Sequence, residues 1–261
     1  MTNSLSMSIL SHEAIQHRAP SVFAQVPSTH VSPNYRFVNT GEVVSMLEDA
    51  GWGVFNVAQQ KVRNYDKRLG TKHIVTLRRR NDSPAKLQLG GLLPSIHLVN
   101  SHDWSSRFEV LLGMLRLVCS NGMMVQGAGF DAYSLRHDKI MEDMQTVMAK
   151  FASNANKMLE MAELWARIRL SDPQAIEFAR MAAILRFGDD ANHLKLLHQR
   201  RSEDLGSSLW NVFNVIQENV MVGGFKVNKR RSRPIANIAA TRDLNVGLFQ
   251  LASTFAPHEL N

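Results

Sequence analysis

The chain has 261 residues, of which 44% are hydrophobic and 20% are charged, so it can bury a sizeable core and its composition excludes a disordered protein. Its 30 Lys and Arg residues outnumber its 23 Asp and Glu residues, and the formal net charge of +7 favours a polyanionic partner, nucleic acid above all. The N-terminus lacks the pattern of a signal peptide, no apolar run approaches the ~20 residues of a membrane span, and the one cysteine, Cys119, excludes an intramolecular disulfide, so we expect a cytoplasmic protein without a membrane segment.

The first expected elements are an N-terminal arm and a helix. Residues 1–34 are rich in Ser, Gln and His and contain three prolines, which predicts a loosely ordered arm. The segment NTGEVVSMLEDAG follows at 39–51. It predicts a helix that Thr40 caps and Gly51 ends, with Val43, Met46 and Leu47 on one apolar face.

Strand-like runs follow at 52–63, 72–80, 86–92 and 94–101. Turn-forming residues separate the first two runs, so we expect 54–63 and 72–80 to pair as a β-hairpin. A row of cations on that ribbon would suit the phosphate backbone of a nucleic acid. The eight cations are Lys61, Arg63, Lys67, Arg68, Lys72, Arg78, Arg79 and Arg80.

The apolar stretch 106–126 suits a buried helix and a buried strand equally well. We predict a helix over 106–119 and a short strand over 122–126, since Asn121 and Gly122 are typical turn residues. Arg116 would then be a charge within an apolar face, and it should be paired or should face a ligand.

The second half of the sequence is helical in pattern. Apolar residues recur every three or four positions over 138–170, which predicts one long helix. Further helices are expected at 171–188, 189–202, 206–222 and 243–254, with Gly223 and Gly224 ending the helix at 206–222. The expected fold is therefore α+β: an arm (1–34), a mixed part with a helix, a β-hairpin and an antiparallel sheet (35–130), and a helical part with one long helix (131–261).

The segment KVNKRRSR at 226–233 is the densest cluster of positive charge. It lies between a helix stop and the last helix, so we expect an exposed basic loop or strand, and phosphate contact is the simplest use of such a cluster. The alternative is a solvated turn whose arginines pair with Glu218 or Asp243.

The sequence gives little support for catalysis. It contains no phosphate-binding loop for ATP, no dinucleotide fingerprint and no nucleophile elbow, so we expect no cofactor. In SIHLVNSHDWSSR, His97, His102 and Asp103 lie close enough in sequence to suggest a weak metal or general-base site. The alternative has His97 packed in a strand and the polar residues after it forming a turn. Trp104 could stack on a base and Arg107 could meet a phosphate, although a buried tryptophan is the commoner case.

The stretches NSHDWSS, GMLRLVCSNGMMV, LWNVFNVIQENVMVGGF and RSRPIANIAATRDLNVGLFQLA resemble a phage- or plasmid-like bacterial family that is known as a domain of unknown function. The resemblance covers roughly 35–255. The chain departs from the pattern at Trp104, where relatives often carry Gly, and at Phe249, where Trp is common. The resemblance implies residence on mobile elements and supplies no catalytic residues.

Three functions follow as hypotheses. The first is ATP-independent single-stranded DNA binding or annealing in recombination or replication by a homo-oligomer, in functional analogy to the RecT and Redβ proteins. The second is a protein-binding effector that counters host defence or takes over the host, and the third is a metal-dependent nuclease using His102 and Asp103. The predicted nucleic-acid contacts are Lys61, Arg63, Arg78, Arg79, Arg80, Trp104, Arg107, Arg116, Lys229, Arg230, Arg231 and Arg233.

Overall fold

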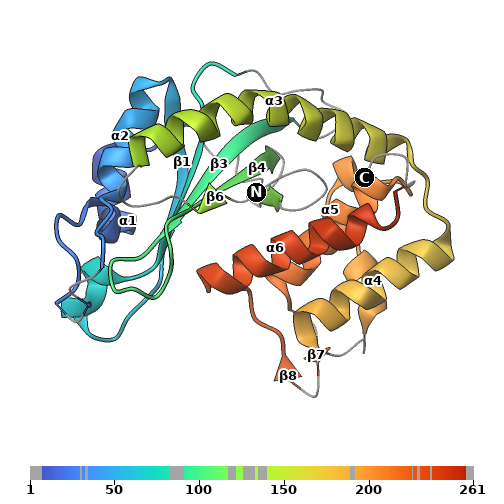
Figure 1. The fold of residues 1–261 in the computed structure, drawn as a ribbon. Coiled ribbons are helices and arrows are strands. Elements are labelled where there is room, and N and C mark those ends of the chain that lie inside the picture. Colours follow the sequence, from blue (N-terminus) through green and yellow to red (C-terminus); the bar gives the residue numbers. More distant parts are fainter. Residues whose placement is uncertain are drawn as a thin grey trace.

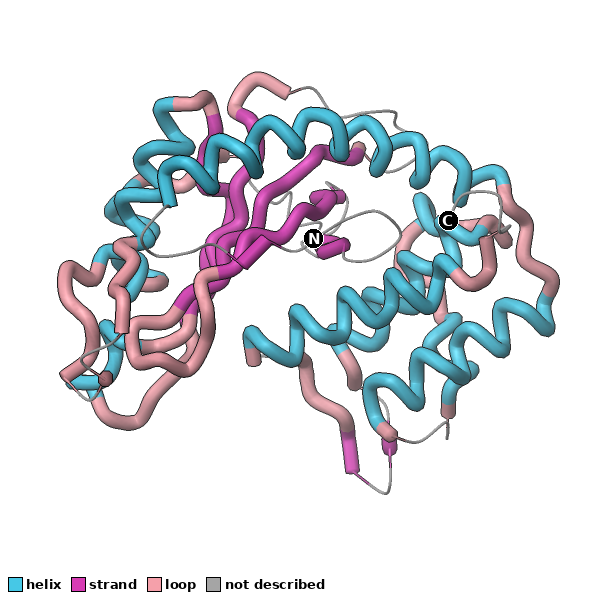
Figure 2. Tube along the Cα trace, in the orientation of Figure 1, coloured by secondary structure: helices cyan, strands magenta, loops and turns pink. Residues whose placement is uncertain are grey.

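The protein folds into a sheet half and a helical half, with one long helix passing over both (Figure 1, Figure 2). This arrangement comes from a computed structural model. It describes residues 8–29, 31–32, 35–82, 91–116, 122–125, 133–134, 140–188, 192–224, 226–227, 230–235 and 237–256. The expected α+β fold is confirmed, because the strands of the antiparallel sheet lie in the first part of the chain and the longer helices follow them. In the described residues no helix is both long and apolar enough to cross a membrane.

The N-terminal arm is more ordered than the sequence predicts. Its described part forms helix α1 (His12–Arg18) and the 3-10 helix η1 (Pro20–Phe23). Ile15 and Val22 are fully buried in the main core, and the amide of Leu10 donates a hydrogen bond to the Val54 carbonyl of the first strand. Apolar residues spaced among the polar ones therefore hold this segment against the sheet.

Helix α2 (Thr40–Asp49) begins one residue earlier than expected. Asn39 is the N-cap, and its side-chain oxygen accepts hydrogen bonds from the amides of Gly41 and Glu42. Thr40 is instead buried, and its hydroxyl bonds to side chains of the sheet. Asn and Thr are both favourable N-cap residues, so the sequence alone could not show which of the two caps the helix.

The sheet is antiparallel with strand order β1-β2-β3-β4-β5, and β6 also pairs with β4. Its strands are β1 (Trp52–Gln59), β2 (His73–Arg79), β3 (Leu92–Asn100), β4 (Glu109–Arg116), β5 (Gly122–Val125) and β6 (Tyr133–Ser134). The expected pairing of β1 with β2 is confirmed, although the 3-10 helix η2 (Tyr65–Gly70) widens their connection. The strand predicted at 86–92 lies mostly outside the described residues.

Strand β4 overturns the helix predicted for 106–119. Leu111 packs with Ile74, Val99 and Ile238 in a small cluster, whereas its neighbour Val110 belongs to the main core. Alternate side chains thus face two different apolar layers, which requires a strand covered on both faces. A strand of this kind is apolar throughout, so periodicity could not distinguish it from a helix. The short strand predicted after it is confirmed as β5.

The helical half contains the long helix α3 (Ile140–Arg167), then α4 (Asp172–Phe187), α5 (Leu209–Val222) and α6 (Ile238–Ser253). The prediction for 189–202 is wrong, since its described residues form two 3-10 turns, η4 (His193–Leu197) and η5 (Ser202–Asp204). Asn192 has a φ of 65°, which breaks a right-handed helix. Helix α6 begins before the predicted 243 because the Asn237 side chain caps the amide of Ala240.

The basic segment 226–233 contains a small ribbon, in which β7 (Lys226–Val227) pairs with β8 (Arg230–Arg231). Helix α5 ends at Gly223, as predicted, with a φ of 64°. Figure 1 shows the ribbon projecting from the helical half, at its lower side. The loop or strand expected here is therefore a strand pair, in which the described side chains of Lys226 and Arg231 are exposed.

Candidate nucleic-acid interface

A buried polar network joins the N-terminal segments to one end of the sheet. His73 begins β2, and its Nε2 lies 2.9 Å from the Thr40 hydroxyl. Its Nδ1 lies 3.1 Å from the Thr71 carbonyl. A carbonyl only accepts, so we assign the proton to Nδ1, and Thr40 donates to Nε2. The Thr40 hydroxyl in turn accepts a hydrogen bond from the side-chain amide of Asn100, 2.9 Å away.

His102 continues this network. Its Nε2 donates to the Ser21 carbonyl at 2.8 Å, and its ring packs against Phe37, with 4.8 Å between the ring centroids. Asn100 also donates to the Val38 carbonyl at 3.2 Å. The NSHD motif therefore connects η1 and the start of α2 to the end of β3. These contacts support the alternative in which the polar residues of the motif have a structural role and do not form a catalytic site.

Burial keeps the histidines of this region neutral. Burial, assisted by the neighbouring His102, lowers the pKa of His73 from 6.5 to about 3. Burial also lowers the pKa of His97 to about 4, and it lowers the pKa of His102. A buried imidazolium would lack the hydration that stabilises its charge.

The metal and general-base site suggested for His97, His102 and Asp103 is not formed. His97 bonds to the hydroxyls of Thr76 and Ser95, both at 3.1 Å. Asp103 is exposed and accepts a hydrogen bond from the amide of Ser105 in the following turn. Within the described residues, no three His, Cys, Asp or Glu side chains are grouped to hold a metal ion.

Two connections meet at the end of the sheet that this network supports. We define the sheet tip as residues 60–72, between β1 and β2, residues 101–108, between β3 and β4, and the neighbouring residues 35–37. The amide of His102 donates to the Gly70 carbonyl at 2.8 Å. The Tyr35 hydroxyl donates to the Ser101 carbonyl at 2.8 Å. The sheet tip is thus one surface, at the lower left of Figure 1.

Exposed aromatic side chains mark the sheet tip. Trp104 is 59% exposed and Tyr65 is 77% exposed, so the expectation of a core role for Trp104 is not met. The rings of Trp104 and Tyr35 lie with centroids 6.3 Å apart. Trp104 also has a φ of 65°, a conformation that is unfavourable for a bulky residue and free of cost for glycine. This geometry would suit the glycine that the resemblance implies at this position.

Basic side chains share the sheet tip with these aromatic residues. Lys61, Arg63 and Arg107, all predicted contacts, are exposed on the sheet tip. Arg68 lies over the ring of Tyr65, 5.5 Å from its centroid. Further basic residues of the sheet tip are Arg36, Lys67 and Lys72, against the acidic Asp66 and Asp103. The surface is strongly basic and offers flat rings, the two requirements of single-strand binding.

A groove of about 560 Å³ lies at the sheet tip, between η2 and the N-terminal helices. Tyr65, Asp66, Arg68 and Leu69 line one side, and Gln16, His17 and Pro20 line the other. Leu69 is 52% exposed. An aromatic ring, an exposed leucine and a guanidinium in one groove can hold a planar base next to a phosphate.

Arg78, Arg79 and Arg80 do not join this surface. They lie at the other end of β2, about 20 Å from His73 at the usual strand rise. Arg78 is buried. Arg79 lies over the ring of Trp52 at 5.5 Å, and Arg80 pairs with Glu48 at 3.2 Å. The eight cations of the hairpin therefore divide between its two ends.

The remaining predicted contacts are also elsewhere. Arg116 is buried and forms an ion pair with Asp204 at 2.5 Å, so it is paired, as its apolar surroundings require, and closed to a nucleic acid. Arg231 and Arg233 are exposed on the helical half. Arg230 is described by its backbone alone, and Lys229 lies outside the described residues. The two basic segments therefore form separate surfaces on different halves of the molecule.

Sequence reasoning missed Tyr35 and Tyr65 as parts of the site. Tyr65 lies in a turn-rich connection between two predicted strands, where an aromatic side chain is rarely buried in the core. Its position in the sequence could therefore have indicated an exposed ring. Tyr35 directly follows the expected arm (1–34), and nothing in the sequence connects it to Trp104. Burial, assisted by the charge of Asp103, raises the pKa of Tyr35 to about 12, so its hydroxyl keeps the proton that it donates.

Comparison with known proteins assigns the chain to a family. The family described as domain of unknown function DUF932 matches residues 27–245. UPF0380 protein YfjQ of Escherichia coli (strain K12) is 29% identical over 258 residues, covering 94% of this chain and 91% of that protein. UPF0380 protein YafZ of the same organism is 28% identical over 256 residues, covering 93% and 90%. No solved structure matches the chain. The protein therefore belongs to the DUF932 family.

Proposed function

We propose that the protein binds single-stranded nucleic acid at the sheet tip without using ATP. The observation that carries this proposal is the exposure of Trp104 and Tyr65 among the cations of the same surface. Base stacking on an aromatic ring contributes about 1–3 kcal/mol per base and tolerates every sequence. Lys and Arg side chains around the rings would hold the phosphate backbone.

The proposal extends to a biological role. We propose that the protein acts in recombination or replication of a phage or plasmid, by annealing complementary strands as a cytoplasmic homo-oligomer. An exposed ring presents a base on one side while its pairing edge stays free, and this arrangement would favour annealing over sequence-specific recognition. The lack of an ATP-binding motif in the sequence is consistent with this role.

Binding of a labelled single strand tests the proposal directly. Fluorescence anisotropy with a short oligonucleotide should show binding that weakens steeply between low and moderate salt, because phosphate contacts release counterions. A duplex of the same length should bind more weakly, since its bases are unavailable for stacking. Absence of binding at low salt, or an affinity that salt does not change, would contradict the proposal.

A second candidate function is protein binding, and α4 favours it. Ile176, Met181, Ile184 and Leu185 of this helix are all more than a third exposed. Apolar side chains that gather on one helix of a surface commonly mark a protein contact. In this function the protein would bind a host protein through its helical half, and would not anneal complementary strands.

A further inference from the structure

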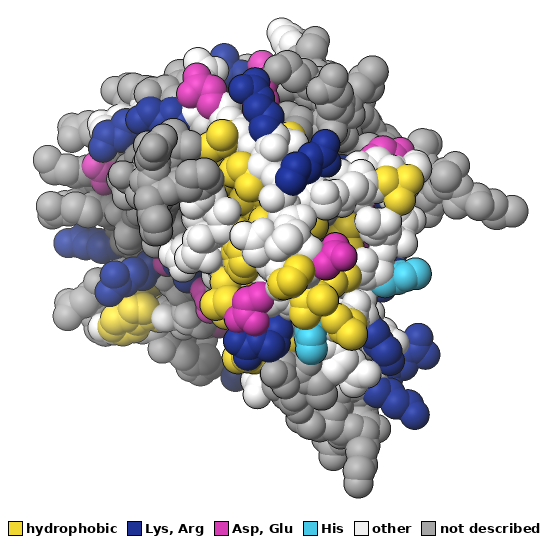
Figure 3. Space-filling model, turned by 90° about the vertical axis from the view of Figure 1, so that its right-hand side faces the viewer, with side chains coloured by type: hydrophobic (Ala, Val, Ile, Leu, Met, Phe, Trp, Pro, Cys, Tyr) yellow, Lys and Arg dark blue, Asp and Glu magenta, His cyan; other side chains and the backbone are white. Residues whose placement is uncertain are grey.

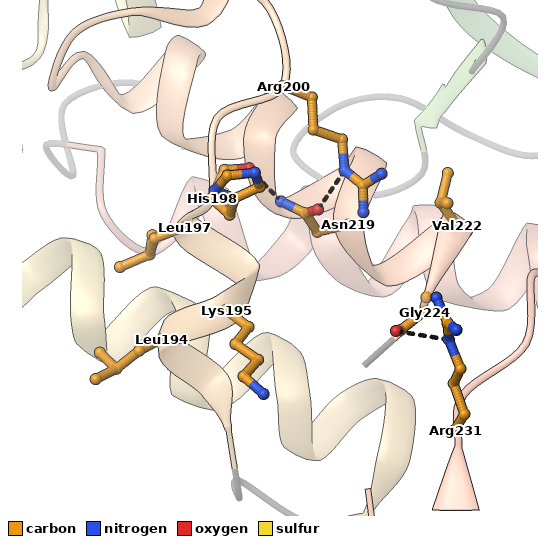
Figure 4. A pocket seen from close by; sticks show the side chains of 10 residues that line it. Leu194, Lys195, Leu197, His198, Arg200, Asn219, Val222, Gly224 and Arg231 are labelled. Carbon is orange, nitrogen blue, oxygen red and sulfur yellow. Dashed lines mark hydrogen bonds between the residues drawn. The ribbon is translucent and has the colours of Figure 1, made fainter. Parts of the chain in front are cut away.

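The helical half contains a groove of about 650 Å³ that is distinct from the sheet tip. It lies between η4 with the residues that follow it, the end of α5 and the strand β8 (Figure 4). Its lining includes the apolar residues Leu194, Leu197 and Val222 and the basic residues Lys195, Arg200 and Arg231. It therefore combines apolar walls with basic side chains.

The lining of this groove carries positive charge without an opposing acid. Its cations are Lys195, Arg200 and Arg231, and no Asp or Glu is among the described residues that line it. The side-chain ammonium group of Lys195 makes no hydrogen bond or ion pair with any described residue. Nearby, Glu218 pairs with Arg201 at 2.8 Å and so does not neutralise the groove. An anionic group entering the groove would meet uncompensated charge.

Both guanidinium groups are already oriented. Nε of Arg200 donates to Oδ1 of Asn219 at 2.7 Å, and Nε of Arg231 donates to the Gly224 carbonyl at 3.0 Å. Both acceptors are neutral, and Figure 4 shows both bonds. Among the described residues, the terminal amino groups of these arginines have no hydrogen-bond acceptor. A guanidinium held in this way can bind a carboxylate through two parallel hydrogen bonds.

Asn219 fixes the geometry of the groove from within. Its side chain is buried, and its amide nitrogen lies within hydrogen-bond distance of the carbonyls of Leu196 (2.9 Å), His198 (2.8 Å) and Val215 (3.0 Å). These contacts hold η4 and the following turn against α5. The arginine Arg200 is therefore attached to a rigid part of the molecule.

Apolar side chains stand open among these charges. Leu194 is 57% exposed and Val222 is 38% exposed, and Leu197 is half-buried beside them. Figure 3 shows hydrophobic side chains gathered on this side of the helical half, with Lys, Arg and His side chains along its lower edge. Burying the exposed leucine against a partner would stabilise a complex.

We infer that this groove binds an acidic peptide segment of a partner protein, one that also carries apolar side chains. A nucleic-acid strand would use the cations and leave the leucines in water. The described lining also contains no ring for base stacking other than the imidazole of His198. This inference rests on the protein-binding role of the helical half and is independent of nucleic-acid binding at the sheet tip.

Short fluorescent peptides test the inference with the full-length chain. A peptide in which Asp and Leu alternate is expected to bind, as measured by anisotropy. Replacing its Leu residues by Ser, or its Asp residues by Asn, should weaken binding by about tenfold or more, since each change removes one of the two complementary features. The protein variants Leu194→Ser and Arg231→Ala should each weaken binding of the first peptide by a similar factor.

Two variants at the sheet tip serve as controls. Leu69→Ser removes a leucine of comparable exposure, and Lys61→Ala removes an exposed cation. Both should leave peptide binding unchanged, and Leu194→Ser should leave oligonucleotide binding unchanged. The inference is overturned if the peptide does not bind, if its Ser version binds equally well, or if an oligonucleotide displaces it. A failure of oligonucleotide binding alone would contradict only the nucleic-acid proposal.

Discussion

Arg116, at the end of β4, forms a buried ion pair with Asp204 of η5, with 2.5 Å between Nη1 and Oδ1. The two side chains are 4% and 2% exposed, and they join the sheet half to the helical half. Burial raises the pKa of Asp204, while the charge of Arg116 acts in the opposite direction. The pair therefore holds two halves together at the cost of removing two charges from water.

Removal of one member of this pair should destabilise the protein strongly. We expect Asp204→Ala to lower the free energy of unfolding by about 3–5 kcal/mol, because it leaves the Arg116 guanidinium buried beside apolar groups. Urea unfolding followed by circular dichroism measures this loss. The double variant Arg116→Met/Asp204→Leu should recover most of it, and Arg180→Ala, which breaks an exposed pair with Glu177, should have no measurable effect. Equal losses in the single and double variants would contradict the prediction.

Replacement of Trp104 by glycine should separate stability from binding. Glycine adopts a φ of 65° without strain, and this gain offsets the larger conformational entropy of glycine in the unfolded chain. We therefore expect the free energy of unfolding to change by less than about 1 kcal/mol. Oligonucleotide affinity should fall by about 1–3 kcal/mol, the value of one stacked base. Trp104→Phe keeps a ring and should retain most of the affinity. If Trp104→Gly binds as well as the parent, Trp104 does not contact the strand.

The cations of the sheet tip should set the salt dependence of binding. The double variant Arg63→Ala/Arg107→Ala should bind more weakly at low salt. The slope of log K against log salt should also be shallower by about 0.7 for each phosphate that the variant no longer neutralises. The matched control is Arg79→Ala/Arg80→Ala at the opposite end of β2, because these two side chains already contact Trp52 and Glu48. Equal changes in both variants would show that binding follows net charge alone.

The buried histidines should make the fold sensitive to mild acid. In the folded chain the pKa of His73 is about 3 and that of His97 about 4, against 6.5 when unfolded. Below pH 6.5 the unfolded chain therefore binds protons that the folded chain does not. Stability should fall as the pH decreases toward about 4, with each histidine contributing up to about 1.4 kcal/mol per pH unit.

Urea unfolding at a series of pH values measures this slope. His97→Gln should make it shallower by the contribution of one histidine, because glutamine does not titrate. A parent protein whose stability is constant between about pH 7 and about pH 5 would show that these histidines are accessible to protons in the folded state.

The sequence predicted those elements whose pattern repeats locally. The apolar residues of α3 recur over its whole length, and Gly223 ends α5 with a positive φ as its sequence position indicates. The failure at β4 has the opposite cause, because the strand is covered on both faces by Ile238 on one side and the main core on the other. The local sequence pattern of a strand cannot show that its second face will be covered by a residue far away in the sequence.

Composition and periodicity were enough to predict the α+β order of the elements, the excess of positive charge and the need of Arg116 for a partner, because these are properties of the chain alone. Which cations share a surface depended instead on how the strands pair. Antiparallel pairing placed Lys61 and Trp104 at one end of the sheet and Arg79 at the other, since strands that run in opposite directions bring alternate connections together. The network around His73 then closed off the imidazoles and left the aromatic rings of the sheet tip facing solvent.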